Sequence, residues 1–179
     1  MLGQGETPPT SPLLPEIARR KSIRKYLPTS VPKDVVERIL EAGRRAPSAK
    51  NRQAWRFIAI QDADLRAKVE EAAFGQEYVG EAPLILALCT TNVEYKMPNG
   101  IASHTVDLSI AGAFMVLQAV HEGLGTCIVT TFREEEVKSL LTVPYSMRIV
   151  MLITVGYPDE EPEPTERLPL SRVTSKDHW

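Results

Sequence analysis

The sequence has few cysteines, few aromatic residues and no excess of charge of either sign. It contains two cysteines, and aromatic side chains make up 6% of the 179 residues. Cys89 and Cys127 lie in apolar, strand-like runs, so we expect buried free thiols and a reducing compartment rather than a disulfide framework. The formal net charge is −2. Such a balance gives no general attraction to nucleic acid or to a membrane surface, so neither is expected as a partner.

Long apolar runs are also missing from the sequence. A membrane-spanning helix needs roughly 20 consecutive apolar residues, and we expect no segment of this chain to span a bilayer. Residues 1–12 are rich in glycine, proline and threonine and lack the apolar core of a signal peptide. We therefore expect a loose N-terminal tail over 1–12, a single domain over 13–179 and a cytoplasmic protein.

Two further absences narrow the possible chemistry. The three histidines, His104, His121 and His178, have no close cysteine or carboxylate at metal-ligand spacing, so we expect no metal site. His104 is expected in a loop and His121 at the core edge of a long helix, and neither lies in a triad-like sequence context. The sequence lacks G-x-G-x-x-G, and the Gly-Leu-Gly at 123–125 is expected to end a helix, which argues against a Rossmann dinucleotide site.

Hydrophobic periodicity predicts alternating helices and strands. Helices are predicted to begin near Ser11, Ser30, Asp62, Thr105 and Thr131, and strands to cover 55–60, 84–88, 127–131 and 148–155. The helix over 105–124 carries few charges, so we expect it to be the central buried helix, with Gly125 as its C-terminal cap. Alternation predicts an α/β (α+β) fold, a three-layer sandwich in which helices flank one mixed central sheet.

The spacing of apolar residues also predicts which helix faces are buried. In the 105–124 helix, the residues predicted to face the core are Val106, Ile110, Ala113, Phe114, Leu117, Val120 and Leu124. In the first helix, Ile17 and Ala18 are predicted to face inward, and the basic residues 19–24 follow at its end. The acidic run from Glu134 to Glu136 is predicted to be a solvated helix start, where carboxylates suit the helix dipole.

A dense cationic run with a hydroxyl inside it is the first candidate binding element. Residues 19–26 read Arg-Arg-Lys-Ser-Ile-Arg-Lys-Tyr. Its polar side chains suit a phosphate, because the planar arginine fork bonds two phosphate oxygens at once. The alternatives are a solvated helix end and a nucleic-acid patch. The second is disfavoured, because apolar residues interrupt the run and the rest of the chain adds no basic face.

The second candidate element is the segment 46–60, which joins a helix to a strand and reads A-P-S-A-K-N-R-Q-A-W-R-F-I-A-I. Asparagine and glutamine side chains each carry a donor and an acceptor, so Asn51 and Gln53 suit the edge of a flat heterocycle. Taken alone, the segment is more typical of an ordinary polar loop followed by a core Trp55.

In combination and in this order, the two elements resemble the opening of the FMN-dependent nitroreductase family. That family's pattern is a basic R-x-S-x-R element, a helix, and then A-P-S-x-x-N-x-Q-x-W before a strand, all of which stands here. The resemblance continues in E-G-L-G-T-C-I-V-T-T-F at 122–132 and in Arg167 followed by L-P-L. It covers the chain from about Ile17 to the end, and it implies the nitroreductase-like sandwich with an extended C-terminal arm.

The resemblance implies an FMN site residue by residue. The positions that match the family's ribityl-phosphate element are Arg20, Lys21, Ser22 and Arg24. The positions that match residues around the flavin are Pro47, Ser48, Asn51 and Gln53, often supplied by the neighbouring subunit, and Ile128, Val129 and Thr130 beside the ring. Arg167 matches a C-terminal phosphate contact. Thr165 stands where many members carry a second cation, so phosphate binding is expected to depend more on Arg20 and Arg24.

The function implied by the resemblance is an FMN-dependent oxidoreductase. NADH or NADPH would reduce bound FMN and leave, and a nitroaromatic, quinone or related acceptor would then be reduced in a ping-pong cycle without a catalytic protein residue. Homodimers with FMN at the interface and a small-molecule acceptor are implied. Same-fold dehalogenation, enoate reduction or flavin breakdown, and a non-catalytic FMN-binding redox sensor, are the alternatives. The short interval 91–104 predicts a more open or smaller substrate site.

Overall fold

The helices and strands follow the hydrophobic periodicity, with boundaries that differ by a few residues. The computed structural model describes residues 13–179, so the tail predicted over 1–12 and the predicted helix start at Ser11 lie outside the described residues. The helices are α1 (Pro15–Arg19), α2 (Lys33–Arg44), α3 (Ala63–Ala72), α4 (Glu77–Glu81), α5 (Ser103–His121) and α6 (Glu134–Leu140), with short 3₁₀ turns η1 (Ala49–Asn51) and η2 (Leu170–Arg172). The strands are β1 (Trp55–Ile60), β2 (Leu84–Thr90), β3 (Gly125–Val129) and β4 (Arg148–Gly156).

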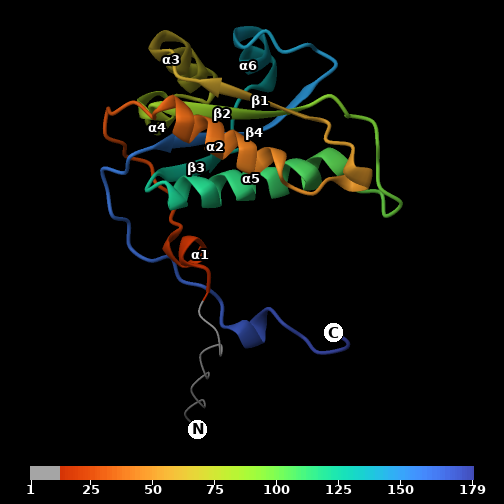
Figure 1. Cartoon of the computed structure of the whole chain (residues 1–179). Helices are drawn as coiled ribbons and strands as arrows, with labels where there is room; N and C mark the ends of the chain where they lie inside the picture. Colours follow the sequence, from red (N-terminus) through yellow and green to blue (C-terminus); the bar gives the residue numbers. More distant parts are fainter. Residues whose placement is uncertain (1–12) are drawn as a thin grey trace.

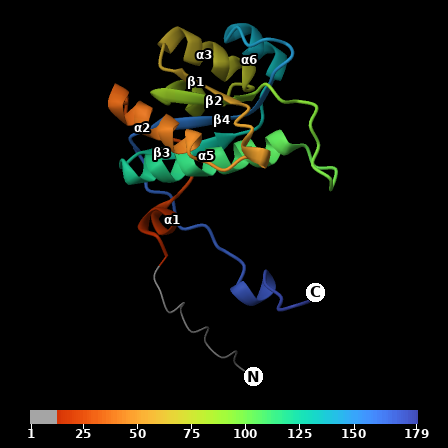
Figure 2. The same ribbon diagram turned by 45° about the vertical axis from the view of Figure 1, so that its right-hand side comes forward.

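The four strands form one sheet in the order β1-β2-β4-β3, and helices cover both of its faces. Helices α2 and α5 lie on one face, while α3 and α6 lie on the other (Figures 1 and 2). Neighbouring side chains on β2 point to opposite faces, as strand geometry requires. Leu86 and Leu88 enter the α2–α5 core, whereas Ile85 and Ala87 enter the core beneath α3 and α6. The predicted three-layer architecture is therefore confirmed.

The sheet is antiparallel along its length, although we expected a mixed sheet. All three strand pairings are antiparallel, and the one parallel contact among residues 13–179 is an isolated bridge between Ser22 and Thr126. The reason lies in the connections. The chain between β1 and β2 contains two helices, α3 and α4, which return it to the end of the sheet where β1 finishes.

Helix α5 contacts the sheet through a different face from the one predicted. Its buried residues are Ser103, Asp107, Leu108, Ala111, Gly112, Met115, Val116 and Ala119. The predicted core residues Val106 and Phe114 are instead 36% and 40% exposed. Small residues explain the choice of face, because a Cβ on Gly112 would already lie 3.2 Å from the sulfur of Met151. The sheet selects the small-residue face and leaves a second apolar face of α5 uncovered.

The same helix corrects the expectation about membrane-spanning segments. The 19 residues of α5 meet the length and composition of a membrane span, and 44% of that window is buried inside the protein. Core helices of folded domains pass the same test, and α5 packs against the sheet on one side.

Several predicted helix boundaries were wrong. Gly123, with φ at 77°, follows the end of α5, whereas Gly125, predicted as the cap, already belongs to β3. Arg133 occupies the N-cap of α6 in place of Thr131, because its backbone N–H donates to the carbonyl of Ala72 at 2.8 Å. His104, predicted in a loop, lies in the first turn of α5.

Two predictions about exposure were also wrong. Ile17 does not face inward in this chain; it is 46% exposed, and α1 has no buried residue. The acidic start of α6 is not fully solvated, because Glu134 accepts hydrogen bonds from Arg148 Nε and the Ile149 N–H, both at 2.9 Å. Burial raises the pKa of Glu134, but these bonds outweigh that effect and lower it below the ordinary value.

After β4 the chain first packs against the basic segment and then leaves the sheet. The N–H of Leu27 donates to the carbonyl of Tyr157, and the N–H of Asp159 donates to the carbonyl of Lys25, both at 2.9 Å. Residues 163–179 are exposed throughout, and η2 lies well away from the sheet in Figure 1.

Candidate functional site

A cavity of about 330 Å³ lies between the basic segment, helix α5 and strand β3. Its lining residues are Arg20, Ser22, Arg24, Ala113, Val116, Leu117, Thr126, Cys127 and Ile128. The fold therefore places three of the predicted phosphate ligands beside Ile128, which was predicted to lie beside a flavin. A basic, hydroxyl-bearing edge next to an apolar wall suits a ligand that has an anionic end and a flat apolar body.

The basic segment is held as an additional strand on the edge of β3. Ser22 forms the parallel bridge with Thr126, and the N–H of Ile23 donates to the Thr126 carbonyl at 2.9 Å. Gly125 permits this approach, because a Cβ there would lie 2.5 Å from Cγ1 of Ile23. With Ile23 buried, the alternation of an extended chain turns Ser22 and Arg24 toward the cavity.

A buried tyrosine holds this segment from the core side. The hydroxyl of Tyr26 donates to the Ile23 carbonyl at 2.5 Å and lies 2.7 Å from Oγ1 of Thr154 in the centre of the sheet. Burial raises the pKa of Tyr26 well above its ordinary value, so the hydroxyl stays protonated and remains a donor. One side chain thus links the phosphate-binding segment to β4.

Glu160, in the chain segment after β4, completes the support. One carboxylate oxygen of Glu160 accepts from the backbone N–H groups of Arg24 (2.5 Å) and Lys25 (3.2 Å). These contacts use the backbone and leave the guanidinium groups available. Among the described residues, no carboxylate lies within ion-pair distance of Arg20 or Arg24, and the Arg24 guanidinium stands over the ring of Tyr78, 5.8 Å from its centroid. Both arginines are therefore free to bind an anion.

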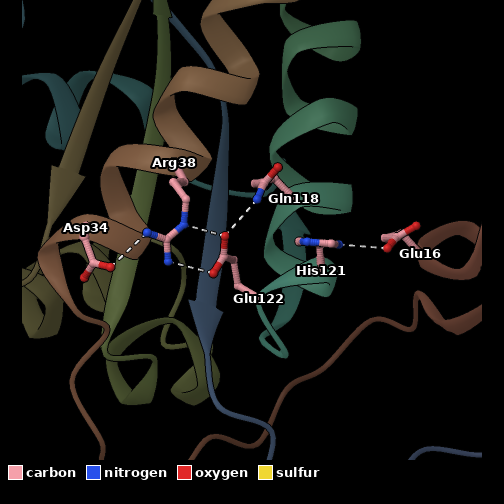
Figure 3. A network of polar contacts seen from close by, with 6 residues as sticks. All are labelled: Glu16, Asp34, Arg38, Gln118, His121 and Glu122. Carbon is pink, nitrogen blue, oxygen red and sulfur yellow. Dashed lines mark hydrogen bonds and ion pairs between the residues drawn. The ribbon is translucent and has the colours of Figure 1, made fainter.

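A polar network fixes α1, which leads into the basic segment. Figure 3 shows Glu16 of α1 beside His121 at the end of α5, with Oε1 and Nδ1 3.0 Å apart. Next to it, Glu122 accepts from Arg38 Nε (2.7 Å) and from Gln118 Nε2 (2.8 Å). The bond with His121 lowers the pKa of Glu16, and Arg38 lowers the pKa of Glu122 to about 2. Both contacts stabilise the fold fully above the ordinary carboxyl pKa, and this contribution is lost as pH falls from there through the lowered pKa values.

The second predicted element lies toward the other end of α5. The N–H of Ala49 donates to Oδ1 of Asp107 at 2.8 Å, which anchors the loop 47–53 near the start of that helix. From Asp107 to Val116 the helix rises about 14 Å, at roughly 1.5 Å per residue. The structure therefore does not bring Pro47, Ser48, Asn51 and Gln53 to the cavity of the same chain.

The loop 47–53 has an unusual backbone. Lys50, Asn51 and Gln53 all have left-handed φ angles, at 55°, 52° and 50°, without being glycine. Each such residue costs of order 1 kcal/mol, and clusters of them occur at binding sites. The loop is held by its own contacts, since Oγ of Ser48 accepts from the N–H of Gln53 at 3.0 Å. The side chain of Asn51 is left exposed.

Four other predicted site residues lie outside the cavity. Lys21 lines a neighbouring cavity, where its ammonium group is 3.7 Å from the Glu161 carboxylate. Val129 is buried in the core beneath α3 and α6, and Thr130 is exposed just after β3. Arg167 lies in the exposed C-terminal tail, where Nη1 donates to two carbonyl oxygens of that tail at 3.2 and 3.4 Å.

Sequence reasoning missed the supports of the cavity and much of its wall. The cavity wall includes Val116 of α5. The sequence pattern predicts the helix there, but it does not indicate which of its residues border the basic segment. Glu160 lies in the acidic run 159–161, which carries no signal for a contact with the basic segment. Tyr26 carried a usable signal, because Ile23 and Tyr26 interrupt the cations as residues anchored in a core do.

The comparisons with known proteins agree with the fold. The family model described as "Nitroreductase family" matches residues 17–99 and 75–157. The chain is 31% identical over 186 residues to an NADH dehydrogenase of Thermus thermophilus, covering 87% of this chain and 91% of that protein. It is 26% identical to the FMN reductase (NAD(P)H) of Bacillus subtilis, covering 93% and 74%. A solved nitroreductase family protein from Clostridium difficile 630 superposes with a TM-score of 0.82 at 30% identity, covering 92% of this chain and 98% of that one.

The anchoring role of Tyr26 is testable by thermal unfolding. Tyr26→Phe leaves the Ile23 carbonyl without its buried donor, a loss of about 1–3 kcal/mol, which lowers Tm by roughly 2–10 °C for a domain of this size. Tyr145→Phe is the matched control, since Tyr145 is 82% exposed and its Tm is expected to stay within about 1–2 °C of the wild type. Equal Tm values for the two variants would contradict the anchoring role.

Proposed function

This chain belongs to the nitroreductase family, and we propose that it is an FMN-dependent oxidoreductase in which NAD(P)H reduces bound FMN and a nitroaromatic, quinone or related acceptor then takes the electrons in a ping-pong cycle. The observation that carries the proposal is the cavity beside β3. There Arg20, Ser22 and Arg24 stand together at the edge of an apolar wall. The two arginines, which have no carboxylate partner among the described residues, suit the phosphate of FMN. The apolar surface around Cys127 suits its flat ring.

The residues of this cavity fit the phosphate end of FMN. Arg20 and Arg24 would each bond phosphate oxygens through their guanidinium groups, and Ser22 would donate its hydroxyl. Ile128 is 50% exposed beside them and offers an apolar surface to a flat ring. When bound, FMN supplies the electron-transfer chemistry, while the protein supplies binding, orientation and positive charge near the reduced, more negative ring. No protein nucleophile is required for this activity.

A homodimer would complete the site. Helix α5 leaves an apolar face uncovered, with Val106 and Phe114 on it. In a two-fold pairing, residue i of one copy meets residue j of the other, and j meets i. If two α5 helices run antiparallel and cross between Ile110 and Ala113, Asp107 of one copy comes beside Val116 of the second copy.

This arrangement would join the two separated elements of the predicted site. The loop 47–53 is carried by Asp107, and the cavity is bordered by Val116. The loop of one copy would therefore enter the mouth of the cavity of the second copy, bringing Asn51 and its amide to the ring of FMN. The exposed tail with Arg167 would likewise find its place on the second copy. We also propose a cytoplasmic location, which suits the two free, buried thiols.

The proposed activity is testable by visible absorption of the purified protein, reconstituted with FMN and kept anaerobic. The flavin band is expected to bleach on addition of NADH or NADPH and to return on addition of a quinone or nitroaromatic, over many turnovers. A band that persists with both donors would overturn the oxidoreductase assignment in favour of a non-catalytic flavin-binding protein. No band after incubation with FMN would overturn the cofactor site itself.

The phosphate assignment is testable by substitution of its two arginines. Arg20→Ala or Arg24→Ala is expected to weaken FMN binding by a factor of about ten or more, because a charge-assisted hydrogen bond contributes roughly 1.5–3 kcal/mol. The measurement is FMN retained through dialysis, followed by fluorescence titration. Lys68→Ala is the control, since Lys68 is exposed on α3 across the sheet. Equal retention in all variants would remove the assignment.

The dimer is testable on the uncovered face of α5. Phe114→Asp is expected to convert the protein from a dimer to a monomer, measured by light scattering after size exclusion. It is also expected to weaken FMN binding by about tenfold or more, which is the order of magnitude for losing one well-buried interface residue. Phe74→Asp is the matched control, because Phe74 is 59% exposed on the other side of the sheet. A Phe114→Asp variant that remains dimeric, or a wild type that is monomeric, would contradict the arrangement.

A further inference from the structure

Two cations of the loop 47–53 lie beside one tyrosine of the loop 91–102. The guanidinium carbon of Arg52 lies 3.9 Å from the centroid of the Tyr95 ring, and the ammonium nitrogen of Lys50 lies 5.4 Å from it. Both cations are exposed, whereas Tyr95 is half-buried. An aromatic ring stabilises nearby cations and limits the positions that their long side chains adopt. The ring thus holds two positive charges close to each other.

These two cations differ from the three arginines of helix α2 and its C-terminal end. Arg44 and Arg45 both bind the Glu41 carboxylate, at 2.6 and 2.7 Å, and Arg38 binds Glu122. Within the described part of the chain, no carboxylate lies within ion-pair distance of Lys50 or Arg52. With a net charge of −2 for the whole protein, this pair is a local positive site and does not reflect a generally basic surface.

The position of the pair relates it to the proposed site. Lys50 and Arg52 flank Asn51, and the left-handed φ angles of Lys50 and Asn51 turn the backbone between the two cations. If the loop enters the cavity mouth of a second copy, as proposed above, the pair lies at the rim of that cavity. A nucleotide that stacks its nicotinamide on the flavin must extend its other end across this rim.

We propose that Lys50 and Arg52, arranged around Tyr95, bind the 2′-phosphate of NADPH and make NADPH the preferred electron donor. This inference rests on the proposed function and names its donor. The 2′-phosphate is the only chemical difference between NADPH and NADH, and it is a compact anion of nearly two charges. The arginine fork bonds two of its oxygens and the lysine adds a point charge, so the pair discriminates between the two donors.

The test is the reductive half-reaction, measured by anaerobic stopped-flow bleaching of FMN without any acceptor, so that binding of an anionic acceptor does not enter. The wild type is expected to bind NADPH at least about tenfold more tightly than NADH. In Lys50→Ala/Arg52→Ala, the apparent Kd for NADPH is expected to rise about 10–100-fold, with the NADH value changed less than about twofold and the limiting bleaching rate kept. The single variant Arg52→Lys keeps the positive charge and is expected to keep part of the preference for NADPH over NADH.

Controls separate this inference from the proposed function. Lys96→Ala removes an exposed cation of the same loop as Tyr95 and is expected to leave both Kd values unchanged. FMN retention in the double variant is expected to equal that of the wild type. Bleaching by both donors with equal affinity, or an equal loss for both in the double variant, would overturn the NADPH assignment while leaving the oxidoreductase intact. No bleaching by either donor would instead overturn the proposed function and this inference with it.

Discussion

The attachment of the basic segment to the edge of β3 is the contact on which the candidate site depends. An arginine-rich strand end has no reason to be ordered by its own charges, since like charges repel. Here the backbone is bonded to Thr126 and Glu160, while the hydroxyl of Tyr26 binds the Ile23 carbonyl from the core side. Because backbone groups and one buried phenol provide the order, Arg20 and Arg24 keep their guanidinium groups for a ligand.

Helix α5 connects the fold with the proposed assembly, because it is apolar on two faces. The face with Ala111 and Gly112 packs closely on the sheet, since small residues allow a short distance between helix and strands. On another face, Val106 and Phe114 remain 36% and 40% exposed. A helix that is apolar all round needs a cover on both sides. In the proposed dimer, a second copy would provide that cover and would also carry the loop 47–53 to the cavity, so one contact would serve both stability and function.

Two sets of cations in this protein differ in their partners. Arg38, Arg44 and Arg45 bind glutamates that hold helices in place, as Figure 3 shows for Arg38 and Glu122. Arg24 and Arg52 instead stand over aromatic rings and have no carboxylate within ion-pair distance among residues 13–179. A cation beside an aromatic ring is positioned without being neutralised. In our proposal, these are the places where an anionic ligand would bind, and both lie on the elements that carry the family pattern.

Much of this protein follows from its sequence alone. The period of apolar residues determined most helices and strands, and the continuous apolar run 84–88 determined the central strand. The order of two short motifs determined the family. These features follow from the sequence because backbone geometry and side-chain chemistry are local properties. Only the tertiary structure decided the antiparallel sheet, the face on which α5 packs, and the separation of Asn51 from Arg24. Those features depend on which surfaces meet, and steric fit between distant residues such as Gly112 and Met151 decides that.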